Sequence, residues 1–499
     1  MDWCGEFFEL EKLLTIKNFP IMFISKNQNF KEEYCASVVR IGETFPIEGK
    51  DRIVKTLVNG LSIVIGKDEF KTGDIAVYCA SETVLHELFL HLNSMYDEKE
   101  LNADQEKRGY INKHGRLRVI RLGGVPSYGL LLHPASIATF INEPVEDVVK
   151  FLESHEGEDF DEINGERFVQ VYVPPIKGQQ ERGSKAERLK KKLDRFKMLI
   201  EGSFRLHYET AQLQKNMRDI NPDDEVYISV KVHGTSAIFA NILTNVPTNW
   251  FKRMWRKYIT HTPEYDQKYN LVYSSRTVVK NEYINKKQKP GGFYSDDVWG
   301  YWAKKLDGLI PKDYCIYCEI AGFTPNGSPI QKGYDYGCTH VAEEKSKLMV
   351  YRATKEGKEL EISDVIMIGA ELKKKLGDCI MMFPLLYQGT LKDLYPEVST
   401  TEHWHENVLE KLKVEKKFKM EEDEPLCRTK VPREGFVLRK ANDPVSEAWK
   451  LKTDAFKFRE AKLVDAGEVD IEMQEGYCVE DVLGHYNQGG YQGPNQHSI

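Results

Sequence analysis

The chain has 499 residues, of which 41% are hydrophobic, and a formal net charge of −7 at pH 7. A chain of this length exceeds what one hydrophobic core ordinarily supports, so we expect two or three domains. The acidic balance excludes bulk basicity as a basis for nucleic-acid binding, and any such contact must come from a local patch of cations.

Signals of a membrane or secretory destination are missing from the sequence. No apolar run approaches the roughly 20 residues of a membrane-spanning helix. The first residues show neither the basic segment nor the apolar core of a signal peptide. The nine cysteines are scattered without a disulfide framework, which is typical of a reducing compartment. We therefore expect an intracellular protein, cytoplasmic or nuclear, that has no membrane partner.

The N-terminal part of the chain is rich in short strands. Residues 1–35 form an aromatic-rich extension to which we assign no structure. Within residues 36–134, alternating runs bounded by turn residues predict five strands, at residues 37–41, 61–65, 74–78, 117–122 and 129–132. Five strands with little helix predict a small β-barrel of the OB kind. Such barrels often bind nucleic acid on one face, but the scattered Lys and Arg here fit a solvated rim equally well.

The rest of the chain divides into a connector, a larger domain and a tail. Residues 135–200 predict a helical connector, in which an amphipathic helix over residues 181–200 carries eight Lys and Arg side chains. These cations form either a solvated face or an element that contacts phosphates. Residues 201–462 mix strands and helices, and residues 463–499 form a frayed tail. The fold class is therefore α+β, with an OB-like barrel followed by a mixed α/β domain.

One lysine stands at the end of a predicted strand in the larger domain. The alternating run at residues 225–230 predicts the strand, and Lys231 follows it, with Gly234 three residues later. A lysine held there can point from a rigid strand into a pocket, and the glycine lets the backbone approach a nucleotide closely. The pattern K-x-x-G also occurs by chance, and a lysine at a strand end is ordinarily a solvated charge.

Four further clusters follow Lys231 in the sequence. Arg276 ends a predicted strand, Glu319 lies inside an apolar strand, and Glu434 precedes a hydrophobic run. Lys450 and Lys452 share one side of another strand, since residues i and i+2 lie on the same face. Taken singly, each has a structural explanation, such as a salt-bridged core carboxylate or a cross-strand ion pair. Their occurrence together and in this order favours a shared chemical role.

The order and spacing of these clusters resemble those of the covalent nucleotidyltransferases, which comprise DNA ligases, RNA ligases and capping enzymes. Lys231–Gly234 resembles their first motif, Glu434–Phe436 the fourth and Lys450–Lys452 the fifth. His233 resembles the RNA ligase 2 branch, and a barrel placed before the core resembles the Deinococcus-type RNA ligases. The resemblance spans roughly residues 36–460. It implies an ATP-grasp-like nucleotidyltransferase fold for residues 201–462.

The resemblance implies an ATP-dependent RNA ligase. Lys231 would attack the α-phosphorus of ATP and form a lysyl-adenylate, with neighbouring cations depressing its pKa. AMP would then pass to an RNA 5′-phosphate, which a 3′-hydroxyl attacks to seal the strand. The implied cofactors are ATP and Mg²⁺ or Mn²⁺. The implied substrate is RNA with broken ends or a nick in a duplex, and we expect a monomer.

The resemblance also assigns nucleotide-binding positions to seven residues: Gly234, Arg276, Glu319, Tyr351, Glu434, Lys450 and Lys452. Arg276 would contact the nucleotide phosphate or the incoming 5′-phosphate end, and Glu319 would bind the ribose hydroxyls or orient the site. Tyr351 would stack on adenine, and Glu434 would engage the metal. Lys450 and Lys452 would stabilise the negative charge that develops at phosphorus.

Two other classes of function remain open from the residues. A DNA ligase or a capping guanylyltransferase shares the motifs, but DNA ligases usually carry an arginine where this chain has Ser236. Both of those classes also place their OB domain after the catalytic core rather than before it. A catalytically inactive RNA-binding protein with an OB domain is the non-enzymatic alternative. The retention of Lys231, Glu319 and Glu434 argues against it.

Overall fold

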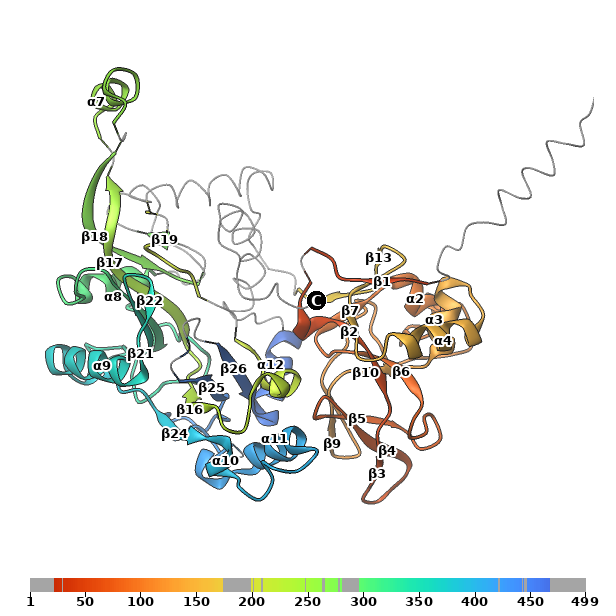
Figure 1. Cartoon of the computed structure of the whole chain (residues 1–499). Helices are drawn as coiled ribbons and strands as arrows, with labels where there is room; N and C mark the ends of the chain where they lie inside the picture. The colour runs from red at the N-terminus through yellow and green to blue at the C-terminus, as the bar shows by residue number, and fades with distance from the viewer. Residues whose placement is uncertain are drawn as a thin grey trace, which may run out of the picture. The chain divides into compact units, whose positions relative to one another are not determined.

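The computed structural model describes residues 22–173 and 199–466, except residues 29, 201, 208–209, 247, 263–264, 277–278, 281–295, 421, 442 and 444–446. The chain divides into two compact units, Met1–Val173 (unit 1) and Pro174–Ile499 (unit 2) (Figure 1). The predicted basic helix, whose cations lie between Arg182 and Lys197, is outside the described residues, as is most of the predicted tail.

Unit 1 is built mainly of short antiparallel strands. One sheet has the order β10-β6-β2-β11, formed by Leu130–Leu132, Ile75–Cys79, Ala36–Arg40 and Asp159–Phe160. A second sheet has the order β3-β4-β5, formed by Thr44–Ile47, Lys50–Val58 and Leu61–Gly66. The smaller sheets pair β8 (Ile120–Leu122) with β9 (Val125–Ser127), β7 (Thr83–Leu85) with β14 (Val169–Val171), and β12 (Glu162–Ile163) with β1 (Ile24–Ser25) and β13 (Glu166–Arg167). Each of the five predicted strand regions contains a strand, whereas β3 and β4 were not predicted.

The central strands of unit 1 are buried on both faces. Along β6, Ile75 and Val77 belong to one apolar cluster, and Ala76 and Tyr78 belong to another. The first cluster includes side chains of three helices: α2 (Glu87–Leu92), α3 (Pro134–Ile141) and α4 (Val145–Ser154). The second includes residues of β4 and β5. This two-sided burial explains why the β6 sequence is apolar without interruption.

The structure differs from the predicted boundaries of unit 1. Residues 135–173, expected to begin a connector, form α3, α4 and the strands β11 to β14, and β11 and β14 pair with β2 and β7. Met22, in the expected N-terminal extension, is fully buried in the same cluster as the helices. Residues 135–200 were predicted only as a helical connector, and a local pattern does not say which surface a helix covers.

Unit 2 contains two sheets. The first has the order β15-β26-β25-β16-β24, formed by Ala211–Gln212, Ala448–Lys452, Gly435–Lys440, Glu225–Lys231 and Leu385–Thr390. The second has the order β19-β18-β17-β20-β21-β22, with β23 pairing with β21; its strands are Val279–Lys280, Asp266–Ser274, Thr235–Val246, Tyr314–Gly322, Ser346–Lys355, Lys358–Glu359 and Ile380–Met381. β16 lies in the first sheet and β17 in the second, so residues 232–234 carry the chain from one sheet to the other.

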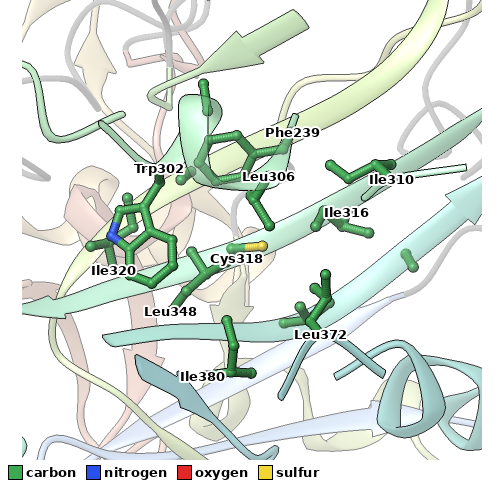
Figure 2. Packing of buried hydrophobic residues seen from close by; sticks show 14 of the residues in the cluster. Phe239, Trp302, Leu306, Ile310, Ile316, Cys318, Ile320, Leu348, Leu372 and Ile380 are labelled. Carbon is green, nitrogen blue, oxygen red and sulfur yellow. The ribbon is translucent and has the colours of Figure 1, made fainter. Parts of the chain in front are cut away.

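Each sheet of unit 2 buries one face under helices. Apolar side chains of the second sheet, among them Phe239, Cys318 and Leu348, pack with Trp302 of α8 (Val298–Leu306) and Leu372 of α9 (Ile362–Leu376) (Figure 2). Alternate residues of the first sheet pack with three further helices, α6 (Leu213–Asn216), α10 (Leu391–Leu394) and α11 (Trp404–Val414). The opposite face of the first sheet carries Lys450 and Lys452, whereas the opposite face of the second sheet holds a further buried cluster that includes Ile238, Cys315 and Tyr317.

Candidate active site

Strand register aligns the first, fourth and fifth motifs. In the antiparallel pairing of β16, β25 and β26, Lys231 lies opposite Gly435, and Gly435 lies opposite Lys452. Val437 pairs in the same way with Lys450. The neighbours of the two lysines, Trp449 and Leu451, are buried in the apolar cluster, so both lysines lie on the other face, as the sequence predicts. Three segments that are distant in sequence therefore meet at one sheet end.

An ion pair joins Lys231 to Glu434. The Lys231 Nζ lies 2.8 Å from Glu434 Oε1, with exposed side-chain fractions of 17% and 2%. The Nδ1 of His233 lies 3.6 Å from Oε2 of the same carboxylate. Burial alone would raise the pKa of Glu434, but the charges of Lys231, His233 and Lys452 outweigh burial and hold it well below its usual range. Glu434 is therefore a buried, ionised carboxylate directed at the Lys231 amine.

Two glycines allow the close backbone contacts of the site. Gly435 has a φ of 149°, and a Cβ built there would lie 1.9 Å from the carbonyl oxygen of Leu451. A Cβ on Gly234 would lie 2.3 Å from the carbonyl oxygen of Ile320. No side chain fits at either position. Gly435 thus holds Glu434 at the start of β25, and Gly234 lets the turn after Lys231 pack on β20.

Hydrogen bonds fix the turn that follows Lys231. The backbone N–H of Gly234 donates to Glu319 Oε1 at 3.0 Å, and the N–H of His233 donates to the Tyr336 hydroxyl at 2.6 Å. The Gln331 side-chain amide donates to the Gly234 carbonyl at 2.8 Å. Glu319 is therefore brought to the turn, while Tyr336 and Gln331 were not found from the sequence. No local pattern marks either residue, since each meets the turn only through the fold.

The facing surface of the second sheet carries Tyr351. Its hydroxyl is hydrogen-bonded to His207 Nδ1 at 2.8 Å, and the Arg439 guanidinium lies 5.4 Å from the centre of its ring. Burial lowers the pKa of His207 well below its usual range, and the charges of Arg276 and Arg352 lower it further. The imidazole is thus neutral. Arg276, which follows β18, is therefore close enough to His207 for its charge to affect the pKa of the imidazole.

Arg439 was not assigned a role from the sequence. Its side chain belongs to β25, on the same face as Val437, and only 5% of it is exposed. No carboxylate of the described residues lies within ion-pair distance of it, and its Nε has no hydrogen-bond partner among them. A buried guanidinium without a carboxylate is costly unless a ligand supplies hydrogen-bond acceptors. Arg439 is therefore a candidate ligand-binding residue.

A helix directly after the fifth motif adds further charges. α12 (Asp454–Asp465) begins at Thr453, and its Glu460 carboxylate lies 2.9 Å from the Lys452 Nζ. Burial, against the opposing charge of Asp454 and together with the charges of Lys413 and Lys452, lowers the pKa of Lys457 on the same helix to about 8. Lys457 was not predicted from the sequence, because a lysine in a helix ordinarily indicates a solvated face.

The donor set for a divalent metal is small. Within the described residues, no group of three or more His, Cys, Asp or Glu side chains is arranged to hold a metal ion. Mg²⁺ and similar ions commonly bind through one or two carboxylates together with substrate phosphates. The ionised Glu434 fits that mode, in which a nucleotide would complete the coordination. A cage made of protein side chains alone does not fit.

Comparisons with known proteins support the barrel. A family model described as an OB-fold domain matches residues 35–134, which confirms the predicted OB fold. No curated protein matches the chain. Among solved structures, a Naegleria gruberi RNA ligase with PPi is similar at 16% identity and a TM-score of 0.48, covering 86% of this chain and 98% of that one. A mutant of that ligase with ATP and Mn is similar at 16% identity and a TM-score of 0.49, covering 85% and 98%. A likeness of this degree assigns no residue roles.

Proposed function

We propose that this chain is an ATP-dependent RNA ligase that works through a lysyl-adenylate on Lys231. The observation that carries the proposal is the placement of the Lys231 amine. It lies 2.8 Å from a buried carboxylate, at a sheet end where strand register also places Lys452. A structural ion pair would not require the two close-packed glycines that hold Glu434 and the turn after Lys231 in place.

The proposed first step is attack of the Lys231 nitrogen on the α-phosphorus of ATP. The N–P bond forms while the bond from the α-phosphorus to the bridging oxygen breaks, and pyrophosphate leaves with the electron pair. The Lys231 ammonium, whose side chain is 17% exposed, first loses a proton to solvent water, and Glu434 accepts a hydrogen bond from the neutral amine and orients the nitrogen. The nitrogen loses a second proton to water once the N–P bond has formed. A divalent ion bound by Glu434 and the nucleotide phosphates would supply additional positive charge.

The other residues of the site bind the nucleotide in this proposal. Lys450 and Lys452 lie on the Lys231 face of the sheet and stabilise negative charge at phosphorus. Glu319 fixes the turn through the Gly234 N–H and orients the ribose. Tyr351 offers an aromatic face to adenine, and Arg439, which lies over the Tyr351 ring, donates hydrogen bonds to the nucleotide.

Two features support RNA as the polynucleotide substrate. The K-x-H-G-T pattern at Lys231 resembles the RNA ligase 2 branch, and the OB-fold domain precedes the catalytic unit. OB folds bind single-stranded nucleic acid through stacking and cations. We assign the sealing of 3′-hydroxyl and 5′-phosphate RNA ends, with the barrel holding the polynucleotide.

Labelled nucleotides test the proposal. The full chain is incubated separately with α-labelled ATP, α-labelled GTP and labelled NAD and then run on a denaturing gel. We expect label to be retained from ATP only, and to be lost in Lys231→Arg. Lys440→Arg is the matched control, because Lys440 lies on the same sheet and pairs with Asp224. Label from GTP would indicate a capping enzyme, and no label from any nucleotide would indicate an inactive RNA-binding protein. Sealing of nicked RNA and nicked DNA duplexes then separates the two ligase classes.

A further inference from the structure

A hairpin of unit 2 carries a helix at its end. β17 pairs with β20 only as far as Asn241, but it pairs with β18 as far as Val246. α7 (Trp250–Trp255) follows and continues into a π-helical turn, Arg256–Thr260. We call residues 250–260 the tip helix. Figure 1 shows α7 at the far end of the β17–β18 hairpin, beyond the labelled elements of the second sheet.

The tip helix exposes an apolar face. Five of its large side chains are between 59% and 73% exposed, and Met254 is 37% exposed: Trp250, Phe251, Trp255, Tyr258 and Ile259. The last four of these lie one, five, eight and nine residues after Trp250, which places all five within about half of the circumference of a helix. A contiguous exposed patch of this kind indicates an interaction surface, whereas single exposed apolar residues do not.

Two of the four basic residues of the tip helix turn away from this face, whereas Lys257 lies over the Tyr258 ring, 5.5 Å from its centre. Lys252 and Arg256 turn back to the hairpin, where both pair with Asp266 at 3.0 Å and 2.7 Å. At about 100° per residue, Trp250 and Tyr258 project to the side opposite this pair. Residues 249–262 include no Asp or Glu. The apolar side therefore points away from the hairpin and is bordered by cations.

We propose that the tip helix binds a lipid surface that carries anionic headgroups. Short amphipathic helices with Lys and Arg on the polar face and Trp or Phe on the other lie in the membrane interface. Trp and Tyr side chains favour the headgroup level, and Arg253 and Lys257 would approach lipid phosphates from the edges. A polynucleotide fits less well, because two of the cations face inward and the outward side is apolar.

This proposal does not depend on the ligase activity. It departs from the expectation of no membrane partner, which considered only apolar runs long enough to span. Among the described residues, no helix has the length and apolar character needed to cross a membrane. Surface attachment needs neither property, since only one side of the helix enters the interface.

Vesicle binding by the full chain tests the proposal. Vesicles are made of phosphatidylcholine alone or mixed with phosphatidylserine, and bound protein is measured by sedimentation. We expect binding to the mixed vesicles only. The double variant Trp250→Glu/Tyr258→Glu should bind about a hundredfold more weakly, from the loss of two inserted aromatic side chains. The matched control, Met367→Glu/Val414→Glu, alters two residues of unit 2 that are 60% and 68% exposed and should bind like the unaltered chain.

Charge variants and RNA separate the remaining outcomes. Arg253→Gln/Lys257→Gln should weaken binding to the mixed vesicles by about fivefold for each cation lost. Absence of vesicle binding by the unaltered chain, or equal loss in tip and control variants, would overturn the proposal. The proposal would also be overturned if a tip variant kept its vesicle binding but lost affinity for labelled RNA or lost self-association. Self-adenylylation should be the same in the tip variant and the unaltered chain, so failure of the ligase proposal would be seen separately.

Discussion

Replacing Lys231 with methionine should destabilise unit 2 as well as abolish adenylylation. Met keeps most of the aliphatic volume but removes the cation that lies 2.8 Å from Glu434, whose side chain is 2% exposed. Removing one partner of a buried ion pair typically costs about 3–5 kcal/mol, because the remaining charge stays buried. His233 and Lys452 still lower the pKa of Glu434, and Lys231 is partly exposed, so we expect the lower end, about 3 kcal/mol.

The effect should depend on pH. The pKa of Glu434 is depressed in the folded chain, so its stabilising contribution is fully present above its unfolded value, about 4.3, and is lost as pH falls through the folded value. In Lys231→Met the pKa of Glu434 in the folded chain rises, which removes part of that stabilising contribution. The difference in stability between the two proteins should therefore be complete at pH 7. It should narrow once the pH falls below the folded pKa of Glu434 in the variant, because the unfolded carboxyl is the same in both proteins and cancels from the difference.

Urea unfolding followed by tryptophan fluorescence measures this difference. Of the seven tryptophans, only Trp3 lies in unit 1, so the signal reports on unit 2. Lys231→Arg is the control that separates charge from chemistry: it should keep most of the stability but form no adenylate. Glu434→Gln combined with Lys231→Met should lose less than the sum of the single losses. Equal stability of Lys231→Met and the unaltered chain at pH 7 would refute the ion-pair reasoning.

The other predictions concern packing and nucleotide binding. Gly435→Ala should lower the free energy of unfolding by about 2–4 kcal/mol, because the new Cβ would collide with the Leu451 carbonyl. Gly369 lies in helix α9 with open space around it, so Gly369→Ala should not lower the free energy of unfolding. Arg439→Ala should weaken ATP binding by about ten- to a hundredfold in calorimetry, and Arg439→Lys by less; unchanged affinity would remove Arg439 from the site. Glu319→Gln should retain more adenylylation than Glu319→Ala, because an amide oxygen can still accept the Gly234 N–H.

Strands β16 and β26 could be predicted because apolar residues alternate with other residues in their sequences. The run at residues 225–230 is strand β16, and Lys450 and Lys452 lie on the face opposite Trp449 and Leu451. Period-two alternation depends only on neighbouring residues, so it can be read without knowing the partners of a strand. Residues 135–200 could be predicted only as a helical connector, because a local pattern does not show that α3 and α4 pack within unit 1.

The contacts that complete the site could not be predicted because they are distant in sequence. Tyr336 meets His233 across 103 residues, and Tyr351 meets His207 across 144. Neither pair has a local pattern, since each joins segments that only the fold brings together. Arg439 could not be predicted as a site residue either. In the sequence it is one more cation at a strand end, and only the structure shows that it is buried over the Tyr351 ring.

Strand register accounts for why the motifs meet at all. Each sheet of unit 2 buries one face, so the polar residues of β16, β25 and β26 share the other face only if the three strands pair in one register. A slip of one residue would turn Lys450 and Lys452 into the apolar cluster and expose Trp449. The close approach of Gly435 to the Leu451 carbonyl opposes such a slip, because any other residue of β25 at that position would place a Cβ against backbone. The glycine beside Glu434 therefore sets the alignment that brings Lys231, Glu434 and Lys452 together, and its replacement should disturb the site before the surrounding sheet.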